Sequence, residues 1–560
     1  MTRLRDALFL ALCGALLVFY GVMQRPLTRS SEGRVARVAQ EMLDDGDWVV
    51  PHLNGVVRLE KPPFSSWLVA LFTKSVSPST AGVPIDVKPW HTYVPPGVAA
   101  VLLLLLVYGW MAKSTPRSSG TPSPGWALFA PLVLATANGF FNQARSAEMD
   151  MLLALFVALA FWGFWENRVS NCPYALLIAY AALGLSILTK GHVGLVIVIP
   201  ALLIWLLVER SHAALPAPPA DRLKWHLAGV ALILILVLPW GIQFLQQSGL
   251  TWDAFKKEGL SGRFGSDVPH YEKPWWYLIQ IPGWFMPWTI LFAIGLYFTW
   301  NLPPDERSPL RRLCWIWLVW STILFSCISS KQRHYAIPFF PPLAMLIADT
   351  TERWLSHPDA ARARGARITL GIFSALFAAA ALASVPIAAK YGMVAADQRP
   401  VLWSVAALAA IVFALAIAKI VSCGCASYLW WAGSVCLVVL FSQTIEQRDA
   451  SSSPEPFCST VRYSVPAGAE IYDYDVALPK REGTVGKPVW RAQVLFYLRR
   501  KVTETETPLA ELLKEKKGAY VIATQKNIEE TPPELFTVIA KDEKFLGHKN
   551  DVFLIQARGQ

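Results

Sequence analysis

Two short segments of the sequence could hold a phosphate group. In Glu60-Lys61-Pro62-Pro63 the prolines restrict the backbone, so that Lys61 can be held as a compact cation. The segment from Ser329 to Tyr335 places Lys331, Arg333 and His334 within four residues, beside a proline-rich apolar run. The alternative is that these cations are solvated side chains that reach from helix ends into water.

A second group of residues could supply a carboxylate to a reaction. Arg145, Glu148 and Asp150 fall in a short turn between two apolar runs. A carboxylate there could act as a base or a metal ligand, or it could merely pair with Arg145. The turn is therefore a candidate site with a structural alternative.

Histidines near these segments raise the question of a metal. His270 and His192 could bind zinc or manganese together with Glu60 or Glu148, because imidazole and carboxylate suit both ions. No ligand spacing requires this, and His270 could instead pack in the aromatic cluster around Trp275. We expect no required cofactor, with a divalent metal as an open possibility and Glu60 and His270 as its candidate ligands.

The composition of the whole chain indicates a membrane protein. Among 560 residues, 54% are hydrophobic and only 16% are charged, whereas about a quarter are charged in soluble domains. The net charge of +11 does not indicate nucleic-acid binding, because Lys and Arg are spread through short loops between apolar runs. We interpret these cations as topology signals and anion contacts.

The apolar runs predict an all-α polytopic domain with about 13 transmembrane helices, each about 20 residues long. The predicted spans are residues 7–23, 91–112, 125–142, 149–166, 173–189, 191–208, 226–245, 276–299, 312–329, 335–350, 368–389, 401–419 and 427–445. Basic loops such as 210–224 and 353–367 favour a cytoplasmic N-terminus and an extracytoplasmic C-terminus.

Two polar regions lie between and after these spans. Residues 1–445 would form the transmembrane domain, with a first extracytoplasmic loop at 24–90, and residues 446–560 a small extracytoplasmic α/β domain. In the loop, apolar residues at helical spacing predict an amphipathic helix on the membrane surface at 32–43, and we expect a second helix at 62–72. In the C-terminal domain the sequence pattern predicts strands at 469–474, 519–524, 535–540 and 551–556, with a helix near 508–517.

This topology places the chemically useful residues on one side of the membrane. Charge beside a bilayer is costly and tends to mark function. The residues at outside ends of spans or in outside loops are Glu32, Arg34, Glu60, Lys61, Arg145, Glu148, Asp150, Lys190, His192, Arg263, His270, Lys331, Arg333 and His334.

The order of motifs resembles the ArnT-like and protein O-mannosyltransferase superfamily of C-type (GT-C) integral-membrane glycosyltransferases. The resemblance covers roughly residues 1 to 350. The motifs that carry it are Ser31-Glu32-Gly33-Arg34, residues 41–55, Glu60-Lys61-Pro62-Pro63, Arg145 to Asp150, Leu188-Thr189-Lys190-Gly191, Arg263 with His270, Pro274-Trp275-Trp276-Tyr277, Pro282-Gly283-Trp284 and Ser329 to Pro338.

The resemblance implies a polyprenyl-phosphate sugar donor, an extracytoplasmic active site, and a lipid A-like glycolipid, glycan or protein hydroxyl as acceptor. It implies a catalytic carboxylate in the first loop, and with the residues described above this makes Glu32 and Asp150 the candidate catalytic carboxylates. The donor phosphate would be bound by Lys61, Lys331, Arg333 and Arg263. The supporting residues would be Arg34, Glu60, Arg145, Glu148, His270 and Tyr335.

One departure from the family pattern concerns the first loop. The family usually has an Asp-Glu pair there, and this chain has Ser31-Glu32. Glu32 could take over the role of the missing Asp, Asp150 could carry the chemistry, or the acceptor could differ or activity could be lost.

Two other function classes remain open from the sequence. A transporter or flippase for lipid-linked saccharides would also have many helices, although charges gathered on one face argue against it. A catalytically silent member whose C-terminal domain binds a partner is the third hypothesis. We expect an enzyme in the bacterial inner membrane whose partners are the donor, the acceptor and membrane lipids, and not nucleic acid.

Overall fold

The structure is a computed structural model of the whole chain. It describes residues 2–58, 61–77, 85–114, 125–211, 222–249, 271–286, 288–299, 309–355, 358–390, 397, 399–419, 427–437, 453–474, 476, 491–505, 507–543, 545 and 551–558. The chain forms two compact units. The helical unit is Met1–Tyr20, Leu59–Phe64 and Pro95–Thr444, and the second unit is Gly21–Arg58, Ser65–Val94 and Ile445–Gln560.

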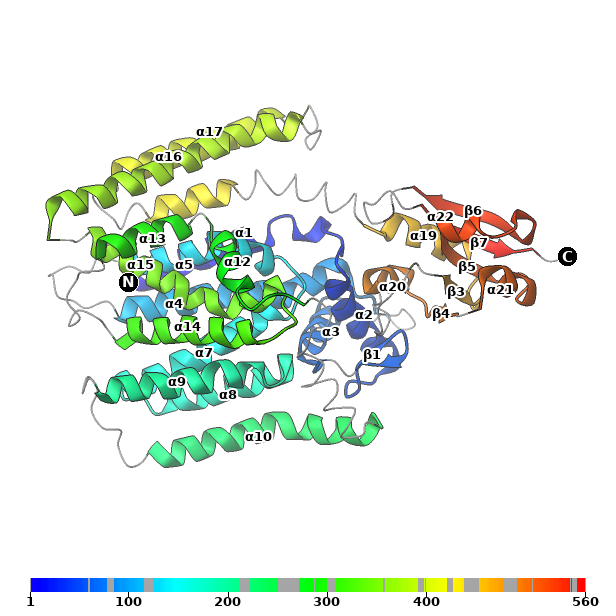
Figure 1. The fold of residues 1–560 in the computed structure, drawn as a ribbon, viewed down its shortest axis with the longest axis horizontal. Coiled ribbons are helices and arrows are strands. Elements are labelled where there is room, and N and C mark those ends of the chain that lie inside the picture. The colour runs from blue at the N-terminus through cyan, green and yellow to red at the C-terminus, as the bar shows by residue number, and fades with distance from the viewer. Residues whose placement is uncertain are drawn as a thin grey trace. The chain divides into compact units, whose positions relative to one another are not determined.

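Long apolar helices dominate the helical unit (Figure 1). Within the described residues, eight helices are long and apolar enough to cross a membrane. They are α1 (Thr2–Phe19), α4 (Pro89–Ser114), α7 (Asp150–Val169), α9 (Val193–Ser211), α10 (Arg222–Gln247), α14 (Pro309–Cys327), α16 (Ala360–Lys390) and α17 (Arg399–Lys419). The protein is therefore a multi-pass membrane protein, as its composition predicts.

The other predicted spans are helical but short or interrupted. Helix α8 (Tyr174–Lys190) is a shorter apolar helix, and the span at 125–142 is split into α5 (Gly125–Thr136) and α6 (Asn138–Ala144). Helices α12 (Trp276–Trp284) and α13 (Trp288–Thr299) meet at 105°, so together they form a broken span or a re-entrant loop. The proline-rich span starts as a 3-10 helix, η4 (Arg333–Phe339), and continues as α15 (Phe340–Leu355). Of the last predicted span, residues 427–437 are described and helical.

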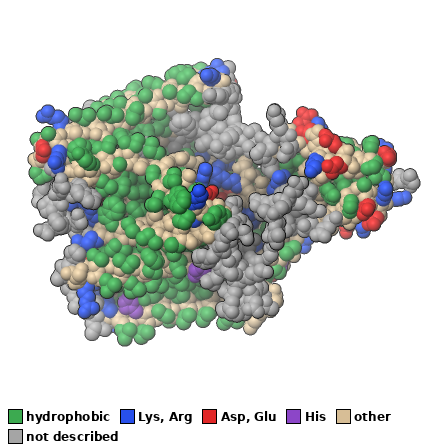
Figure 2. Space-filling model, viewed as in Figure 1, with side chains coloured by type: hydrophobic (Ala, Val, Ile, Leu, Met, Phe, Trp, Pro, Cys, Tyr) green, Lys and Arg blue, Asp and Glu red, His purple; other side chains and the backbone are tan. Residues whose placement is uncertain are grey.

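Apolar side chains cover the exposed sides of the long helices (Figure 2). On α10, exposed residues include Leu223, Leu227, Ile235 and Ile242. A helix that exposes so many large aliphatic side chains would be unstable in water, but it matches the acyl chains of a bilayer. The surface of this unit thus agrees with the membrane prediction made from the sequence.

The second unit combines parts of the first predicted loop with the C-terminal region. The loop supplies α2 (Ser30–Asp45), the hairpin strands β1 (His52–Leu53) and β2 (Val56–Val57), and α3 (Phe64–Val76). The first residue of α3, Phe64, belongs to the helical unit. The C-terminal region supplies α19 (Glu455–Ser464), α20 (Ala492–Leu498), α21 (Leu509–Glu515), α22 (Gln525–Glu529) and a five-stranded sheet.

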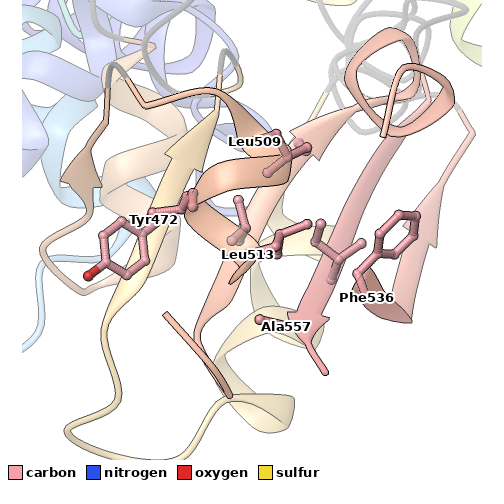
Figure 3. Packing of buried hydrophobic residues seen from close by; sticks show 9 residues of the cluster. Tyr472, Leu509, Leu513, Phe536 and Ala557 are labelled. Atoms are coloured by element: carbon pink, nitrogen blue, oxygen red, sulfur yellow. The ribbon is translucent and has the colours of Figure 1, made fainter. Parts of the chain in front are cut away.

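The sheet confirms the strands predicted from the sequence. Its strands are β3 (Ile471–Tyr474), β4 (Thr503–Glu504), β5 (Tyr520–Thr524), β6 (Phe536–Asp542) and β7 (Val552–Ala557), in the order β4-β3-β5-β7-β6. β3 pairs in parallel with β4 and β5, while β7 is antiparallel to β5 and β6. Figure 3 shows how Leu509 and Leu513 of α21 pack against the sheet beside Tyr472 and Phe536. The predicted helix near 508–517 is α21.

The predicted helices of the first loop are confirmed, but the predicted surroundings of the first one are wrong. The sequence pattern places helix α2 on the membrane surface. Between Glu32 and Met42, however, ten of its residues are buried. It packs against α20 and β1. The helix is therefore enclosed by protein.

Candidate active site

The helix pair α7 and α8 brings Asp150 and Lys190 together. The two helices pack against each other and are joined by a short connection, residues 170–173. Asp150 begins α7 and Lys190 ends α8, so both lie at the same end of this antiparallel pair. A carboxylate at a helix N-terminus and an ammonium at a C-terminus are each favoured by the helix dipole. The Lys190 Nζ donates to Asp150 Oδ1, and the side chains are only 3% and 2% exposed.

Glu148 and His334 extend this ion pair into a buried cluster. His334 Nδ1 lies 3.5 Å from Glu148 Oε2, and its Nε2 lies 3.8 Å from Asp150 Oδ2. Gln143 Nε2 donates to Glu148 Oε2 at 2.8 Å. Two carboxylates in one buried place need nearby positive charge, and Lys190 supplies it beside Asp150.

Tyr335 and Lys61 complete the surroundings of the cluster. The Lys190 ammonium lies 4.1 Å from the centre of the Tyr335 ring, a favourable cation–π arrangement. Lys61 is close enough to act electrostatically on both Asp150 and His334. The structure thus gathers the predicted residues Asp150, Glu148, Tyr335 and Lys61 in the helical unit.

Arg333 and Lys331 have opposite environments. The guanidinium of Arg333 is exposed and makes no hydrogen bond or ion pair with any residue that the structure describes. Lys331 is buried, and its Nζ donates to the carbonyl oxygens of Glu272, at 2.9 Å, and Ile328, at 2.5 Å. Burial lowers the pKa of Lys331.

The contacts of Lys331 tie two loops together. Tyr271 forms an isolated antiparallel bridge with Ser330, and Glu272 N donates to Ser329 O at 3.1 Å. Tyr277 adds a hydrogen bond from its hydroxyl to Gln332 O at 3.0 Å. A phosphate would have to compete with two backbone carbonyls for the Lys331 ammonium, whereas Arg333 offers an open guanidinium.

Arg145 binds the end of a helix. Its guanidinium donates to the carbonyl oxygens of Leu17 at 3.0 Å, Val18 at 3.2 Å and Tyr20 at 2.7 Å. Leu17 and Val18 lie in the last turn of α1 and Tyr20 directly follows it, where backbone acceptors have no partner within the helix. Arg145 therefore fastens α1 beside the turn that carries Glu148.

The cluster also contains a possible metal-ligand set. One ligand atom each from Glu148, Asp150 and His334 lie within 4.8 Å of one another. Oxygen and imidazole donors fit a divalent cation such as zinc or manganese. Lys190 already contacts Asp150 and would compete with such an ion. The ligand candidates predicted from the sequence, Glu60 and His270, lie outside the described residues, as does Arg263.

Glu32 and Arg34 belong to the second unit. Glu32 is fully buried in the first turn of α2, where its Oε2 accepts a hydrogen bond from Arg29 N at 3.3 Å. This contact is that of a capping-box glutamate at the start of a helix. Arg34 Nη1 donates to Ser30 Oγ at 3.4 Å. Glu32 therefore has a structural role in α2 besides its predicted catalytic one.

Sequence reasoning assigned Lys190 and His334 to the extracytoplasmic side but did not select them as site residues. Both had a signal. Lys190 follows the apolar run of α8, and His334 stands between Arg333 and Tyr335 in a segment with an evident phosphate-binding pattern. Their partners lie 40 residues or more away in sequence, so the pairing itself had no local signal.

The comparisons with known proteins agree with this architecture. A family model described as dolichyl-phosphate-mannose-protein mannosyltransferase matches residues 60–242. A relative from Erwinia tasmaniensis, named undecaprenyl phosphate-alpha-4-amino-4-deoxy-L-arabinose arabinosyl transferase, is 27% identical over 78% of this chain and 73% of its own length. A relative from Pseudomonas fluorescens with a corresponding name is 26% identical over 66% of this chain and 62% of its own length.

A solved structure shares the fold along nearly the whole chain. The crystal structure of ArnT from Cupriavidus metallidurans bound to undecaprenyl phosphate matches with a TM-score of 0.70 and 19% identity, covering 98% of this chain and 97% of that one. The sequence resemblance noted in the first 350 residues is thus confirmed. The chain is therefore similar in sequence to ArnT-like glycosyltransferases of the C type and shares the fold of ArnT.

Proposed function

We propose that this protein transfers a sugar from a polyprenyl-phosphate donor to an acceptor on the extracytoplasmic face of a bacterial inner membrane. The main support is the buried cluster of Asp150, Lys190, Glu148 and His334, with the open guanidinium of Arg333 near it in sequence. The relatives named as arabinosyl transferases point to an amino-pentose donor, and the acceptor we propose is a lipid A-like glycolipid.

In this proposal the donor phosphate is bound by Arg333 and Lys61. The acceptor oxygen attacks the anomeric carbon, the bond from that carbon to the phosphate oxygen breaks, and polyprenyl phosphate leaves. Negative charge grows on the phosphate as this bond breaks. A guanidinium and an ammonium bind the growing charge more strongly than the ground state, and this lowers the barrier.

A hydroxyl acceptor must also lose its proton, and we assign that proton to Glu32. The resemblance places the catalytic carboxylate in the first loop. Asp150 already contacts the Lys190 ammonium, and an ion-paired carboxylate is a weaker base. We therefore give Asp150 the role of holding Lys190 and orienting the donor. An already ionised phosphate acceptor would need no base.

Glu148, Asp150 and His334 are the residues that would hold a divalent cation, and the chemistry it supplies there is positive charge toward a phosphate. For the topology we propose a cytoplasmic N-terminus and an extracytoplasmic C-terminus, supported by the basic loops between spans.

The test is a transfer assay with purified protein in detergent. Undecaprenyl phosphate-linked amino-pentose is the donor, lipid A the first acceptor, and mass spectrometry detects the product. Glu32→Gln, Asp150→Asn and Lys61→Ala are compared with Glu511→Gln, an exposed carboxylate in α21. We expect product with the wild type and the control, and strong loss in the other variants.

Two outcomes would contradict the proposal. Wild-type turnover in both Glu32→Gln and Asp150→Asn would exclude the assigned carboxylates. Absence of product with any donor, while undecaprenyl phosphate still binds, would favour a lipid-saccharide transporter.

A further inference from the structure

Within the second unit, α20 of the C-terminal region lies directly on α2 of the first loop. A Cβ atom added to Gly33 would come within 2.2 Å of Gln493 N and 2.5 Å of Gln493 Cα. This is contact between two backbones, so neither side can yield by rotating a side chain. Gly33 directly follows Glu32 in α2, and the contact therefore fixes the turn of α2 that carries Glu32.

Hydrogen bonds secure the same contact on the N-terminal side of Glu32. Ala492 N donates to Ser30 Oγ at 3.3 Å, and Gln493 Nε2 donates to Thr28 O at 3.4 Å. Leu27 N donates to the Tyr497 hydroxyl at 2.8 Å, in a buried position. The backbone that leads into α2 is thus held by side chains and backbone from α20.

A second attachment holds the hairpin that follows α2. Asn54 Nδ2 donates to Val502 O at 2.9 Å, and Val502 N donates to Asn54 Oδ1 at 3.1 Å. The hairpin is also bound to α2, because the backbone N–H groups of Asn54 and Gly55 donate to the Glu41 carboxylate at 2.8 and 3.0 Å. Glu41 pairs in turn with buried Arg37 at 2.7 Å.

We propose that residues 492–502, here called the clamp segment, position the first loop for catalysis through their contacts with Gly33, Leu27 and Asn54. The inference rests on the proposed function, in which Glu32 accepts the proton of the acceptor. The clamp segment touches no reacting atom in this scheme and acts through α2. A displacement of about 1 Å in a reacting group can cost about 100-fold in rate, so the loss of one attachment should be measurable.

Two conservative variants weaken the clamp. Asn54→Gly removes both hydrogen bonds to Val502, and glycine suits the backbone there because Asn54 has a φ of 57°. Tyr497→Phe removes the hydroxyl that accepts from Leu27 N and that also hydrogen-bonds to Ser453. The matched control is Tyr463→Phe, because Tyr463 lies in α19 of the same unit and is 91% exposed. Each variant is checked for folding by its thermal unfolding midpoint.

The expected result is a selective effect on turnover. Asn54→Gly and Tyr497→Phe should lower kcat by about tenfold, while the Kd for undecaprenyl phosphate stays within about twofold of wild type. Amide hydrogen exchange within residues 27–45 should accelerate in both variants and not in Tyr463→Phe. If the clamp segment only stabilised the fold, the two variants would lower the unfolding midpoint without lowering kcat selectively relative to Kd.

A double-mutant cycle separates positioning from general stability. In a Glu32→Gln background, Asn54→Gly should lower the residual rate by less than about twofold, since the group that it misplaces is already inactive. The clamp inference is overturned if Asn54→Gly and Tyr497→Phe both keep wild-type kcat, or if the losses in the double variant multiply. Failure of the proposed function looks different, because then the wild type forms no product or Glu32→Gln turns over normally.

Discussion

The two candidate carboxylates are held in different ways. Asp150 lies in the helical unit and is placed by its own helix hairpin, with Lys190 only 40 residues away. Glu32 lies in the second unit, on a helix held by residues more than 460 positions later in the chain. The main partner of Asp150 thus lies in the same hairpin, with His334 added from a later segment. The helix that carries Glu32 depends on contacts with a segment near the C-terminal end of the chain.

The largest effect should come from breaking the Asp150–Lys190 pair. Lys190→Met leaves a buried carboxylate without its cation, which costs about 3–5 kcal/mol of stability. The double variant Asp150→Asn with Lys190→Met should recover most of that stability and none of the transfer activity. Thermal unfolding and the transfer assay measure the two effects, and recovery of activity along with stability would reduce this pair to a structural role.

The next effect concerns the other carboxylate. Gly33→Val forces side-chain atoms against the backbone of Gln493, and overpacking of this kind costs about 1–3 kcal/mol. We expect a lower unfolding midpoint together with loss of turnover. The control is Gly109→Val, since a Cβ at Gly109 meets nothing within 4 Å. Equal behaviour of the two variants would mean that remote packing does not hold α2.

A smaller effect, on the binding of the donor phosphate, should distinguish Arg333 from the two carboxylates. Arg333→Ala removes an exposed guanidinium, so stability should not change, while the Kd for undecaprenyl phosphate should rise by about tenfold to 100-fold through loss of a charge-assisted hydrogen bond. Arg333→Lys should recover part of the affinity. Unchanged affinity in Arg333→Ala would remove this residue from the phosphate site.

The smallest effect should come from Lys331. Lys331→Gln retains a donor for one of the carbonyls of Glu272 and Ile328, so the loss of stability should be about 1 kcal/mol. The Kd for undecaprenyl phosphate should rise by less than about threefold, in contrast to Arg333→Ala. A loss of affinity as large as that of Arg333→Ala would show that Lys331 binds the phosphate directly.

The sequence predicted most of the fold because its signals are local. Long apolar runs located the spans, and short apolar runs such as that of β7 located the strands, since both patterns report which side chains face a bilayer or a core. The division of the loop and the C-terminal region into one compact unit had no such signal. Helix α20 has only seven residues, too few for a clear helical pattern.

Prediction of the site was limited because contacts between distant segments decide the environment of each residue. Lys331 and Arg333 look equivalent in the sequence, yet one is buried against carbonyls and the other is exposed. Which cation is free depends on the position of Glu272, in another segment. Gly33 gave no warning either, because the need for glycine comes from the backbone of Gln493 and not from a turn in α2.

The distance between Ser30 and Ala492 along the chain also affects how the protein is made. Synthesis proceeds at about 5–20 residues per second, so the 462 positions between these partners correspond to roughly 20–90 s. During that time α2 has emerged from the ribosome but α20 does not yet exist, and the apolar side of α2 has no permanent cover. The nascent first loop therefore has a long window in which a chaperone or a translocation factor can bind it, and maturation of the second unit must be one of the last steps of biogenesis.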